Sequence, residues 1–476
     1  MTADLALIYP ELWLLAAACL ALLAAAFSRD PMQAAAYGLA QAGLVGALAI
    51  DVWLGAGQHR VGFSGAVVVD PMAVVLKAFI FATGVLVFVY VREHLKNRGR
   101  VPGEQFALGL FAVLGMSVMV SAHSLLTAYL GLELLSLSLY SMVAMEQDSA
   151  VASEAAMKYF VLGAIASGML LYGMSMLYGV TGSLDLDATS MATMAGTDKR
   201  LLLVFALSFI VIGVAFKLGV VPFHMWLPDV YQGASTSATL FIASVPKIAA
   251  FALAIRLLVD GLGGLAQDWR AMLAVLAVLS MAIGNVVAIA QVNIKRMLAY
   301  STIAHMGYLL LGIIAGTVNG YAAGMFYALV YALMSAGAFG MVILLGRREG
   351  DAELISDFQG LGRRSPWFAL VMMVFMFAMA GVPPFAGFWA KWFVIKEVVA
   401  AGHTGLAVAA VLFSVIGAYY YLRLVKVMFF DEPAVPAAIS ASGDLRLAVS
   451  ANGVAVLALG LLPGLLMHLC LIAMRG

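Results

Sequence analysis

Charged residues are scarce in this sequence: Asp, Glu, Lys and Arg make up 11% of its 476 residues, whereas hydrophobic residues make up 64%. A soluble globular chain carries about 25% charged residues. The scarcity therefore excludes a soluble protein and predicts a polytopic membrane protein, whose length is best counted in apolar spans of about 20 residues. Because the net charge is only +1, neither an acidic partner nor a nucleic acid is indicated.

Cysteine is nearly absent, and the two that occur, Cys19 and Cys470, stand at opposite ends of the chain. Two such residues cannot form a disulfide framework, a zinc site or an iron–sulfur site, and we expect both to be buried as apolar residues. The sequence also lacks a G-x-G-x-x-G motif after a strand and a Walker loop. We therefore predict no cofactor or metal on this chain, so that any redox chemistry would belong to partner subunits.

Long apolar runs predict an all-α fold of about fourteen transmembrane helices. The expected spans are 7–27, 35–54, 72–92, 105–121, 123–145, 155–179, 200–221, 235–259, 269–290, 297–316, 320–346, 366–400, 404–430 and 444–471. One set of short loops carries most of the basic residues, namely Arg92, Lys96, Arg98, Arg100, Lys295, Arg296, Arg347, Arg348, Arg363, Arg364, Arg423 and Lys426. Since Lys and Arg stay in the cytoplasm, both termini are predicted to be periplasmic.

Two motifs occur twice along the chain. GVVPFHMW (219–226) is similar to GVPPFAGFW (381–389), and MKYFVLGAIAS (157–167) is similar to MFYALVYALMS (325–335). An odd number of predicted helices separates the copies, which indicates an inverted repeat in which each half contains one Pro-broken helix. We expect three N-terminal helices in 1–104, the first repeat in 105–268, the second in 269–430 and a C-terminal helix in 431–476.

Four ionisable residues lie deep in the predicted spans: Glu133, Lys217, Lys247 and Lys391. A lysine near the bilayer midplane costs roughly 2.5–3.5 kcal/mol on insertion scales, and the lysines lie close to the predicted helix breaks. A desolvated lysine can release its proton near neutral pH. We interpret these residues as a path for protons or ions, and the alternative is a set of structural ion pairs within the bundle.

Other titratable residues have secondary roles in this interpretation. Glu154 and Lys158 are spaced as an i,i+4 pair with the acid first, which is the better orientation. His224 and His305 could extend a proton relay, and the alternative for each is a hydrogen-bonded structural histidine. Lys77, in the third predicted span, is expected to extend to the membrane interface or to be neutralised locally.

Four stretches of the sequence are familiar. They are FKLGVVPFHMWLPDVYQGA (216–234), KRMLAYSTIAHMGY (295–308), EAAMKYFVLGA (154–164) and GFWAKW (387–392). These resemble the subunit N family of bacterial NADH–quinone oxidoreductase, respiratory complex I, one of the antiporter-like membrane subunit families. The resemblance is clearest over 105–430. One departure is that Ser235 stands where the family has a proline after Gly-Ala, which leaves the start of the eighth helix undetermined.

The resemblance implies a role for each buried charge. Glu133 matches the glutamate of helix five, Lys217 the lysine of helix seven that pairs with it, Lys247 the central lysine of helix eight, and Lys391 the exit-side lysine of helix twelve. Glu154 and Lys158 match secondary charged positions. By resemblance, the chain would be one proton-translocating module whose energy comes from electron transfer to quinone elsewhere in the complex.

The resemblance also implies the surroundings of the chain. Its partners would be the antiporter-like subunits M and L and the small subunits A, J and K, in the bacterial inner membrane. NADH, FMN, iron–sulfur clusters and quinone would be bound by partner subunits, and the isolated chain would catalyse no reaction. One alternative is a subunit of a multi-subunit Na⁺/H⁺ antiporter built on the same plan. Another is a structural membrane scaffold whose charges only pair helices.

Overall fold

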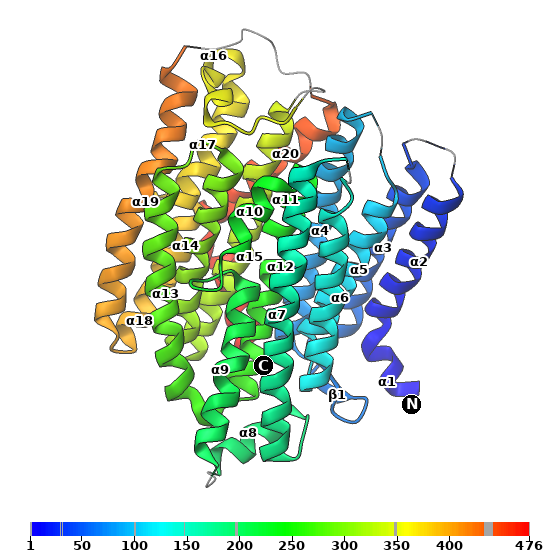
Figure 1. The fold of residues 1–476 in the computed structure, drawn as a ribbon, viewed down its shortest axis with the longest axis vertical. Coiled ribbons are helices and arrows are strands. Elements are labelled where there is room, and N and C mark those ends of the chain that lie inside the picture. The colour runs from blue at the N-terminus through cyan, green and yellow to red at the C-terminus, as the bar shows by residue number, and fades with distance from the viewer. Residues whose placement is uncertain are drawn as a thin grey trace.

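The computed structural model describes residues 2–28, 30, 32–99, 101–146, 148–195, 199–346, 350–432 and 441–475. Within these ranges the chain forms a bundle of long helices and one two-stranded hairpin (Figure 1). Arg100, Arg347 and Arg348, which belong to the predicted basic loops, lie outside the described residues.

The prediction of an all-helical polytopic membrane protein is confirmed. Twelve helices within the described ranges are long and apolar enough to cross a membrane, against about fourteen expected. The predicted span at 105–121 is the shorter helix α5 (Glu104–Val120). The predicted span at 366–400 is divided into α17 (Pro366–Ala380) and α18 (Ala386–Ala400). These short or interrupted helices account for the difference.

The N-terminal helices pack side by side and lead into a hairpin. Their elements are α1 (Thr2–Leu5), η1 (Ala6–Ile8), α2 (Tyr9–Phe27), α3 (Ala34–Gly55), β1 (Arg60–Gly62), β2 (Val67–Val69) and α4 (Pro71–Asn97). The two strands are antiparallel, with Arg60 opposite Val69. Asp70 caps α4 by accepting a hydrogen bond from the Ala73 amide at 2.7 Å, and Pro71 suits the first turn because no intrahelical N–H is needed there.

The central part of the chain contains the first broken helix. Its elements are α5, α6 (Leu125–Val143), α7 (Ala150–Thr181), α8 (Leu186–Met194), α9 (Arg200–Leu218), α10 (Trp226–Gly233), α11 (Thr236–Ala243), α12 (Val245–Ala254) and η2 (Ile255–Asp260). Ser235, the residue that departs from the family pattern, is the N-cap of α11 and accepts a hydrogen bond from the Ala238 amide at 3.3 Å. A serine N-cap therefore begins the helix at this position.

The second half repeats the interruption. Its elements are η3 (Gly263–Leu265), α13 (Ala266–Ile289), α14 (Ile294–Ile314), α15 (Val318–Leu345), η4 (Ile355–Phe358), α16 (Leu361–Arg364), α17, α18 and α19 (Thr404–Phe430). The segment Thr236–Asp260 and helices α14 and α15 are buried along nearly their whole length. Helices that are apolar on every side belong at the centre of a bundle, and this is where the candidate site lies.

Both ends of the described chain lie at the same end of the bundle. Leu7 packs with Val69 of β2. After α20 (Gly443–Leu461) and α21 (Pro463–Arg475), Met474 lines a cavity together with Val61 of β1. We call this the hairpin end and the opposite end, which carries α16, the α16 end (Figure 1).

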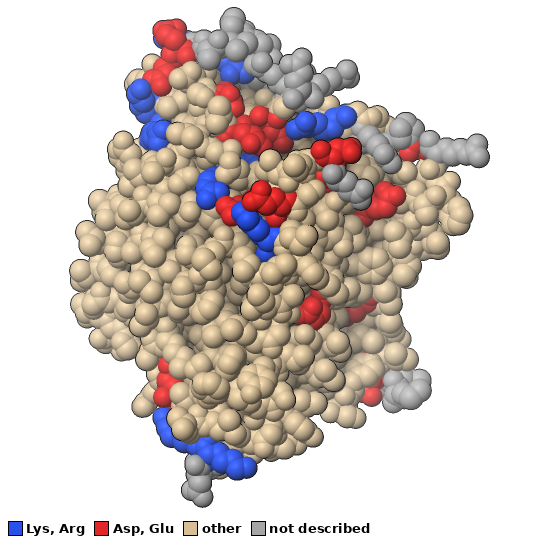
Figure 2. Space-filling model, in the orientation of Figure 1, with Lys and Arg blue, Asp and Glu red and all other residues tan. Residues whose placement is uncertain are grey.

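Charged side chains gather toward these two ends, with few in the band between them (Figure 2). At the α16 end, ion pairs join Arg98 to Asp351 at 3.0 Å and Arg363 to Glu432 at 2.7 Å. The uncharged band is the part of the surface suited to lipid. Cys470 is buried as predicted, whereas the prediction for Cys19 is wrong because it is exposed, which is compatible with an apolar residue facing a bilayer.

Candidate functional site

Lys217 lies in the last turn of α9 and reaches across to α6. Its Nζ donates a hydrogen bond to Ser136 Oγ at 2.7 Å, and Ser136 in turn donates to the Leu132 carbonyl at 2.6 Å. Lys217 is partly buried and lines a cavity of about 10 Å³, which is near the minimum for one water molecule. The lysine is thus held by a hydroxyl within the membrane region.

Glu133 lies on α6 three residues before Ser136. Its Oε1 is buried and has no hydrogen-bond partner, and among the described residues it forms no ion pair with Lys217. The arrangement expected from the family resemblance was a direct pair. In this structure Ser136 holds the lysine, while Glu133, whose buried Oε1 has no partner, lies one helical turn earlier on α6.

Lys247 follows a break in the segment Thr236–Asp260. The regular helix is interrupted at Ser244, whose Oγ donates to the Leu240 carbonyl at 2.7 Å. Pro246 is the second residue of α12, a position in the first turn where a backbone N–H would have no intrahelical partner. Lys247 is 1% exposed, and its Nζ donates to the carbonyl of Leu218 at 3.0 Å. The lysine therefore sits against the last residue of α9.

Lys391 sits in the same way in the second half of the chain. Its Nζ donates to the carbonyl of Ala380, the last residue of α17, at 2.9 Å. A second bond reaches Ser414 Oγ at 2.9 Å, and the ammonium lies 4.9 Å from the ring centre of Tyr308. A helix C-terminus carries a partial negative charge equivalent to about −0.5. Lys247 and Lys391 are thus both stabilised by the carbonyl end of a broken helix.

The two helix ends have the same local form. Gly219 follows Leu218 with φ +82°, and Gly381 follows Ala380 with φ +86°. Such left-handed residues are accessible to glycine and strained for other L-residues. The turn leaves terminal carbonyls free for the lysines, which explains why the repeated Gly-Val motif lies beside them.

His305 is fully enclosed by tyrosines. Its Nδ1 is 2.7 Å from the hydroxyl of Tyr327, and its Nε2 is 3.0 Å from that of Tyr421. Tyr331 donates a separate hydrogen bond to Thr302 at 2.7 Å. The result is a buried polar network on α14, α15 and α19. No hydrogen bond among the described residues links this network directly to Lys247.

A cluster toward the α16 end surrounds Asp229, and we call it the Asp229 cluster. Lys158 Nζ lies 2.8 Å from Asp229 and 2.8 Å from Glu154, which confirms the predicted i,i+4 pair. Arg296 lies 2.8 Å from the other oxygen of Asp229. These side chains line a cavity of about 180 Å³, so water can reach charged groups at this end.

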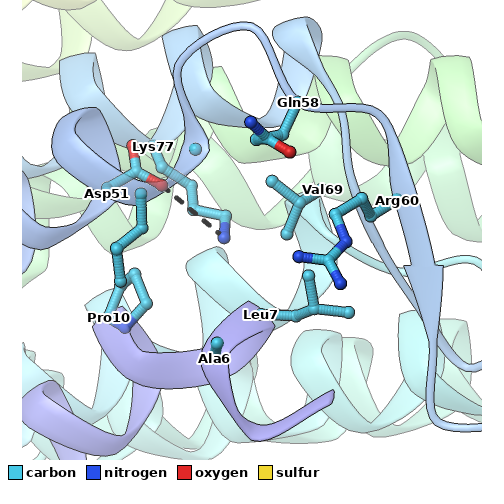
Figure 3. A pocket seen from close by; sticks show the side chains of 10 residues that line it. Ala6, Leu7, Pro10, Asp51, Gln58, Arg60, Val69 and Lys77 are labelled. Atoms are coloured by element: carbon cyan, nitrogen blue, oxygen red, sulfur yellow. Dashed lines mark ion pairs between the residues drawn. The ribbon is translucent and has the colours of Figure 1, made fainter. Parts of the chain in front are cut away.

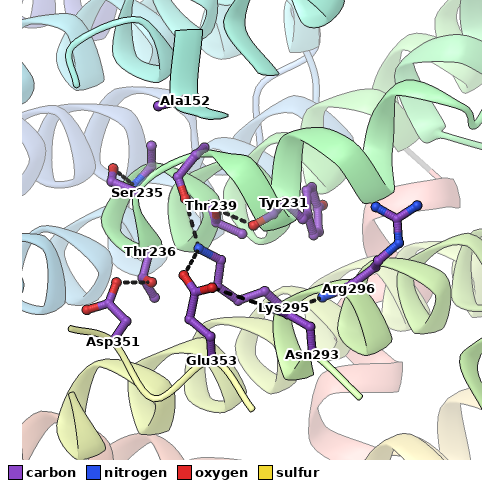
Figure 4. Close-up of polar contacts among 12 residues, drawn as sticks. Ala152, Tyr231, Ser235, Thr236, Thr239, Asn293, Lys295, Arg296, Asp351 and Glu353 are labelled. Atoms are coloured by element: carbon purple, nitrogen blue, oxygen red, sulfur yellow. Dashed lines mark hydrogen bonds and ion pairs between the residues drawn. The ribbon is translucent and has the colours of Figure 1, made fainter. Parts of the chain in front are cut away.

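Next to this cluster, Lys295 is held in a salt bridge. Its Nζ donates to the Ala234 carbonyl at 2.9 Å and to Glu353 at 2.8 Å (Figure 4). Figure 4 also shows Thr236 bonded to Asp351. His224 lies apart from these groups, between α9 and α10, and its Nδ1 has no partner among the described side chains.

Sequence reasoning singled out the lysines and His305 but not most of the groups that bond to them. Ser414, Tyr327 and Tyr421 were not singled out, because nothing near them in sequence marks them. The carbonyls of Leu218 and Ala380 are backbone groups, so residue type cannot identify them. The repeated Gly-Val-x-Pro motif was the only available signal, since it locates the helix ends that expose these carbonyls.

One group of side chains has the composition of a metal site. Ligand atoms of His123, Asp185 and Asp187 lie within 4.8 Å of one another. Asp187 is exposed, and its carboxylate pairs with His123 at 3.3 Å. Exposed acidic groups of this kind are common without an ion, and we assign no metal to them.

The chain matches one family model, described as "NADH:quinone oxidoreductase/Mrp antiporter, TM", over residues 122–417. It is 54% identical over 463 residues to NADH-quinone oxidoreductase subunit N of Thioalkalivibrio sulfidiphilus, covering 97% of this chain and 96% of that protein. It is 57% identical over 461 residues to the same subunit of Thiobacillus denitrificans, covering 97% and 95%.

Solved structures give the same result. A chain of respiratory complex I from Thermus thermophilus with bound aureothin is similar with a TM-score of 0.81 and 34% identity, covering 97% of this chain and 98% of that one. The Mrp complex from Dietzia sp. has a similar chain with a TM-score of 0.86 at 22% identity, covering 100% and 97%, which shows the fold alone. These comparisons confirm the resemblance: the chain belongs to the subunit N family of NADH-quinone oxidoreductase, the antiporter-like membrane subunits of respiratory complex I.

Proposed function

We propose that this chain translocates protons through Glu133, Lys217, Lys247, His305 and Lys391. One observation carries the proposal. Lys217, Lys247 and Lys391 bond to hydroxyl or carbonyl oxygens, and none forms an ion pair with a carboxylate among the described residues. By contrast, the buried lysines Lys77 and Lys295 both pair with carboxylates.

The difference in partners matters for proton release. A lysine paired with a buried carboxylate is held charged, because deprotonation would leave the carboxylate without a counterion. A hydroxyl or carbonyl oxygen carries no net charge and remains a hydrogen-bond acceptor for a neutral amine. Lys217, Lys247 and Lys391 can therefore change protonation state without breaking an ion pair. This is the property that a proton carrier requires.

The groups around the lysines indicate the order in which a proton would pass between them. The Asp229 cluster, including Glu154 and Lys158, offers the loading point, because its cavity of about 180 Å³ admits water. From Lys217 the proton passes to Lys247, since Lys247 Nζ is bonded to the residue after Lys217. The step from Lys247 to the network of His305 requires water, and Lys391 is the last carrier. We assign His224 no direct step.

We also propose the membrane topology that the basic loops predict. Adding α5 and the interrupted α17–α18 unit to the twelve candidate spans gives fourteen, with the α16 end in the cytoplasm and both termini in the periplasm. The matching glycine turns after α9 and α17 support an inverted repeat of 105–268 and 269–430, flanked by 1–104 and 431–476.

The energy for this transport would come from the rest of the complex. We propose that subunits A, J, K, L and M are the membrane neighbours in the bacterial inner membrane, and that NADH, FMN, iron–sulfur clusters and quinone bind elsewhere. Relatives above 50% identity are subunits of NADH-quinone oxidoreductase. The Na⁺/H⁺ antiporter alternative is supported by the shared family model, whose description includes the Mrp antiporter, and by similarity of fold to a chain of the Mrp complex.

The proposal is tested in the complete complex reconstituted into vesicles. Glu133→Gln keeps the shape of the side chain and removes the charge next to Lys217, so proton transport per NADH oxidised should fall strongly, and Glu133→Asp should have a milder effect. Glu432→Gln, at an exposed position, is the matched control and should behave as the parent. A normal ratio in an assembled Glu133→Gln complex would contradict the proposal.

A further inference from the structure

A second set of buried charges lies in the N-terminal helices, apart from the lysines of the proposed path. Lys77 on α4 is 1% exposed, and its Nζ lies 2.8 Å from Glu11 on α2 and 3.8 Å from Asp51 on α3. Ser117 on α5 donates to the same Glu11 oxygen at 2.6 Å. Of the two alternatives expected for Lys77, local neutralisation is the one observed, by Glu11 and Asp51, which were not identified as its partners from the sequence.

Glu11, Asp51 and Lys77 form a group that we call the N-terminal triad. The charges in this triad do not balance. Two carboxylates face one ammonium, and Glu11 and Asp51 are 7% and 3% exposed. Each carboxylate has one buried oxygen, Glu11 Oε2 and Asp51 Oδ2, without a partner among the described residues. An unbalanced buried charge is strongly unfavourable, so the triad has both the charge and the free acceptor atoms to hold one more cation.

The triad also has access to the aqueous phase. A cavity of about 100 Å³ is lined by Asp51 and Lys77 and extends to Gln58 and Arg60 at the hairpin end (Figure 3). Gln58 and Arg60 are exposed, and Arg60 is the other charged residue lining the cavity. The cavity is large enough for several water molecules. A positively charged arginine at its mouth disfavours the passage of metal cations, whereas a proton can move between water molecules.

We propose that Glu11, Asp51 and Lys77 form a single-proton site that exchanges with the aqueous phase at the hairpin end through this cavity. Like charges held close together cannot both remain ionised in a low-dielectric site. The carboxylate pair therefore shares one proton while Lys77 stays charged, which makes the triad neutral. The site is independent of the path through Lys217, Lys247 and Lys391, since it lies on other helices.

The test is infrared difference spectroscopy of the intact complex, reading the C=O band of a protonated carboxyl. The parent should show a band that shifts in D₂O and is missing from Asp51→Asn. Glu11→Gln should also lose it, because the remaining Asp51 then pairs alone with Lys77. Lys77→Met should gain intensity, because two carboxylates without an ammonium take up a further proton. Asp187→Asn, at an exposed carboxylate, is the control and should keep the parent band.

Three results would overturn the proposal. The first is an Asp51→Asn spectrum identical to the parent's. The second is a band that survives in Glu11→Gln, since the proton would then belong to Asp51 alone. The third is a band removed by Na⁺ at constant pH with choline as the reference cation, which would assign the site to a monovalent metal ion.

Discussion

The ammonium of Lys247 lies 3.0 Å from the carbonyl oxygen of Leu218, the residue at which α9 ends. Lys391 makes the corresponding bond of 2.9 Å with Ala380, at which α17 ends. Each lysine is therefore held by the end of an interrupted helix and not by a carboxylate. The acceptor cannot titrate, so any change of charge at these sites belongs to the lysine.

Lys247→Arg separates a proton carrier from a fixed positive charge. Arginine keeps the charge and can still donate to the Leu218 carbonyl, but it does not lose its proton in proteins. We expect an assembled complex whose proton transport falls by about tenfold or more, nearly as far as in Lys247→Ala, since positioned proton-transfer groups contribute roughly 10²–10⁴. The measurement is vesicle acidification per NADH oxidised, with assembly assayed on the same preparation. Parental transport in the arginine variant would mean that fixed charge suffices.

Gly219→Ala should destabilise the end of α9. An alanine at φ +82° is strained by about 1–2 kcal/mol, and its Cβ would meet Leu227 Cδ1 at 2.5 Å. Gly405→Ala is the matched control, because no atom lies within 4 Å of its Cβ and alanine favours the helix by roughly 0.5–1 kcal/mol. The temperature at which the chain dissociates from the complex should fall in the first variant and hold or rise in the second. Equal dissociation temperatures for the two variants would show that alanine is not strained at position 219.

Asp351 should make the α16 end sensitive to acid. Burial alone would raise the pKa of this carboxyl, but hydrogen bonds from His94 and Thr236 and the charge of Arg98 outweigh it and hold the pKa well below its usual value. A lowered pKa means that the stabilisation is complete above the unfolded value of about 3.9 and is lost as the pH falls below it.

Asp351→Asn tests this directly. At neutral pH it should lower stability by about 1.5–3 kcal/mol, the typical contribution of a hydrogen bond to a charged group. It should also flatten the dependence of stability on pH below about 4, where the carboxyl of the unfolded parent takes up a proton while that of the folded parent stays ionised. Thermal dissociation at two pH values measures both effects. A variant that matches the parent at neutral pH would show that the contacts of Asp351 contribute little.

Topology can be tested with single cysteines in a background lacking Cys19 and Cys470. The two substitutions are His59→Cys, at an exposed position of the hairpin end, and Asn97→Cys, at the α16 end. Because basic loops remain in the cytoplasm, a membrane-impermeant maleimide added to spheroplasts should label position 59 and reach position 97 only after permeabilisation. The reverse pattern would invert the proposed orientation.

The sequence predicted the features that residue type encodes. Proline and glycine mark helix interruptions, so the breaks beside Lys217 and Lys391 were accessible from the motif alone. Charged residues in apolar runs are equally visible, which is why Glu133 and the three lysines were singled out as candidates. The i,i+4 spacing of Glu154 and Lys158 was sufficient because one helix carries both residues.

Contacts between distant segments could not be predicted in this way. Ser136 meets Lys217 across 81 residues, and Tyr421 meets His305 across 116, and serine and tyrosine are common in such helices. Glu11 was not singled out from the sequence. Its meeting with Lys77 depends on how α2, α3 and α4 pack, which no local pattern specifies.

The order of the N-terminal triad along the chain bears on how the protein is made. Glu11 and Asp51 lie on α2 and α3, so they leave the ribosome before Lys77 on α4. A lone lysine would cost roughly 2.5–3.5 kcal/mol on insertion, but here both acidic partners precede it. The third span therefore enters the bilayer with its counterions already in place, an advantage that the first two spans, which carry the acids, do not have.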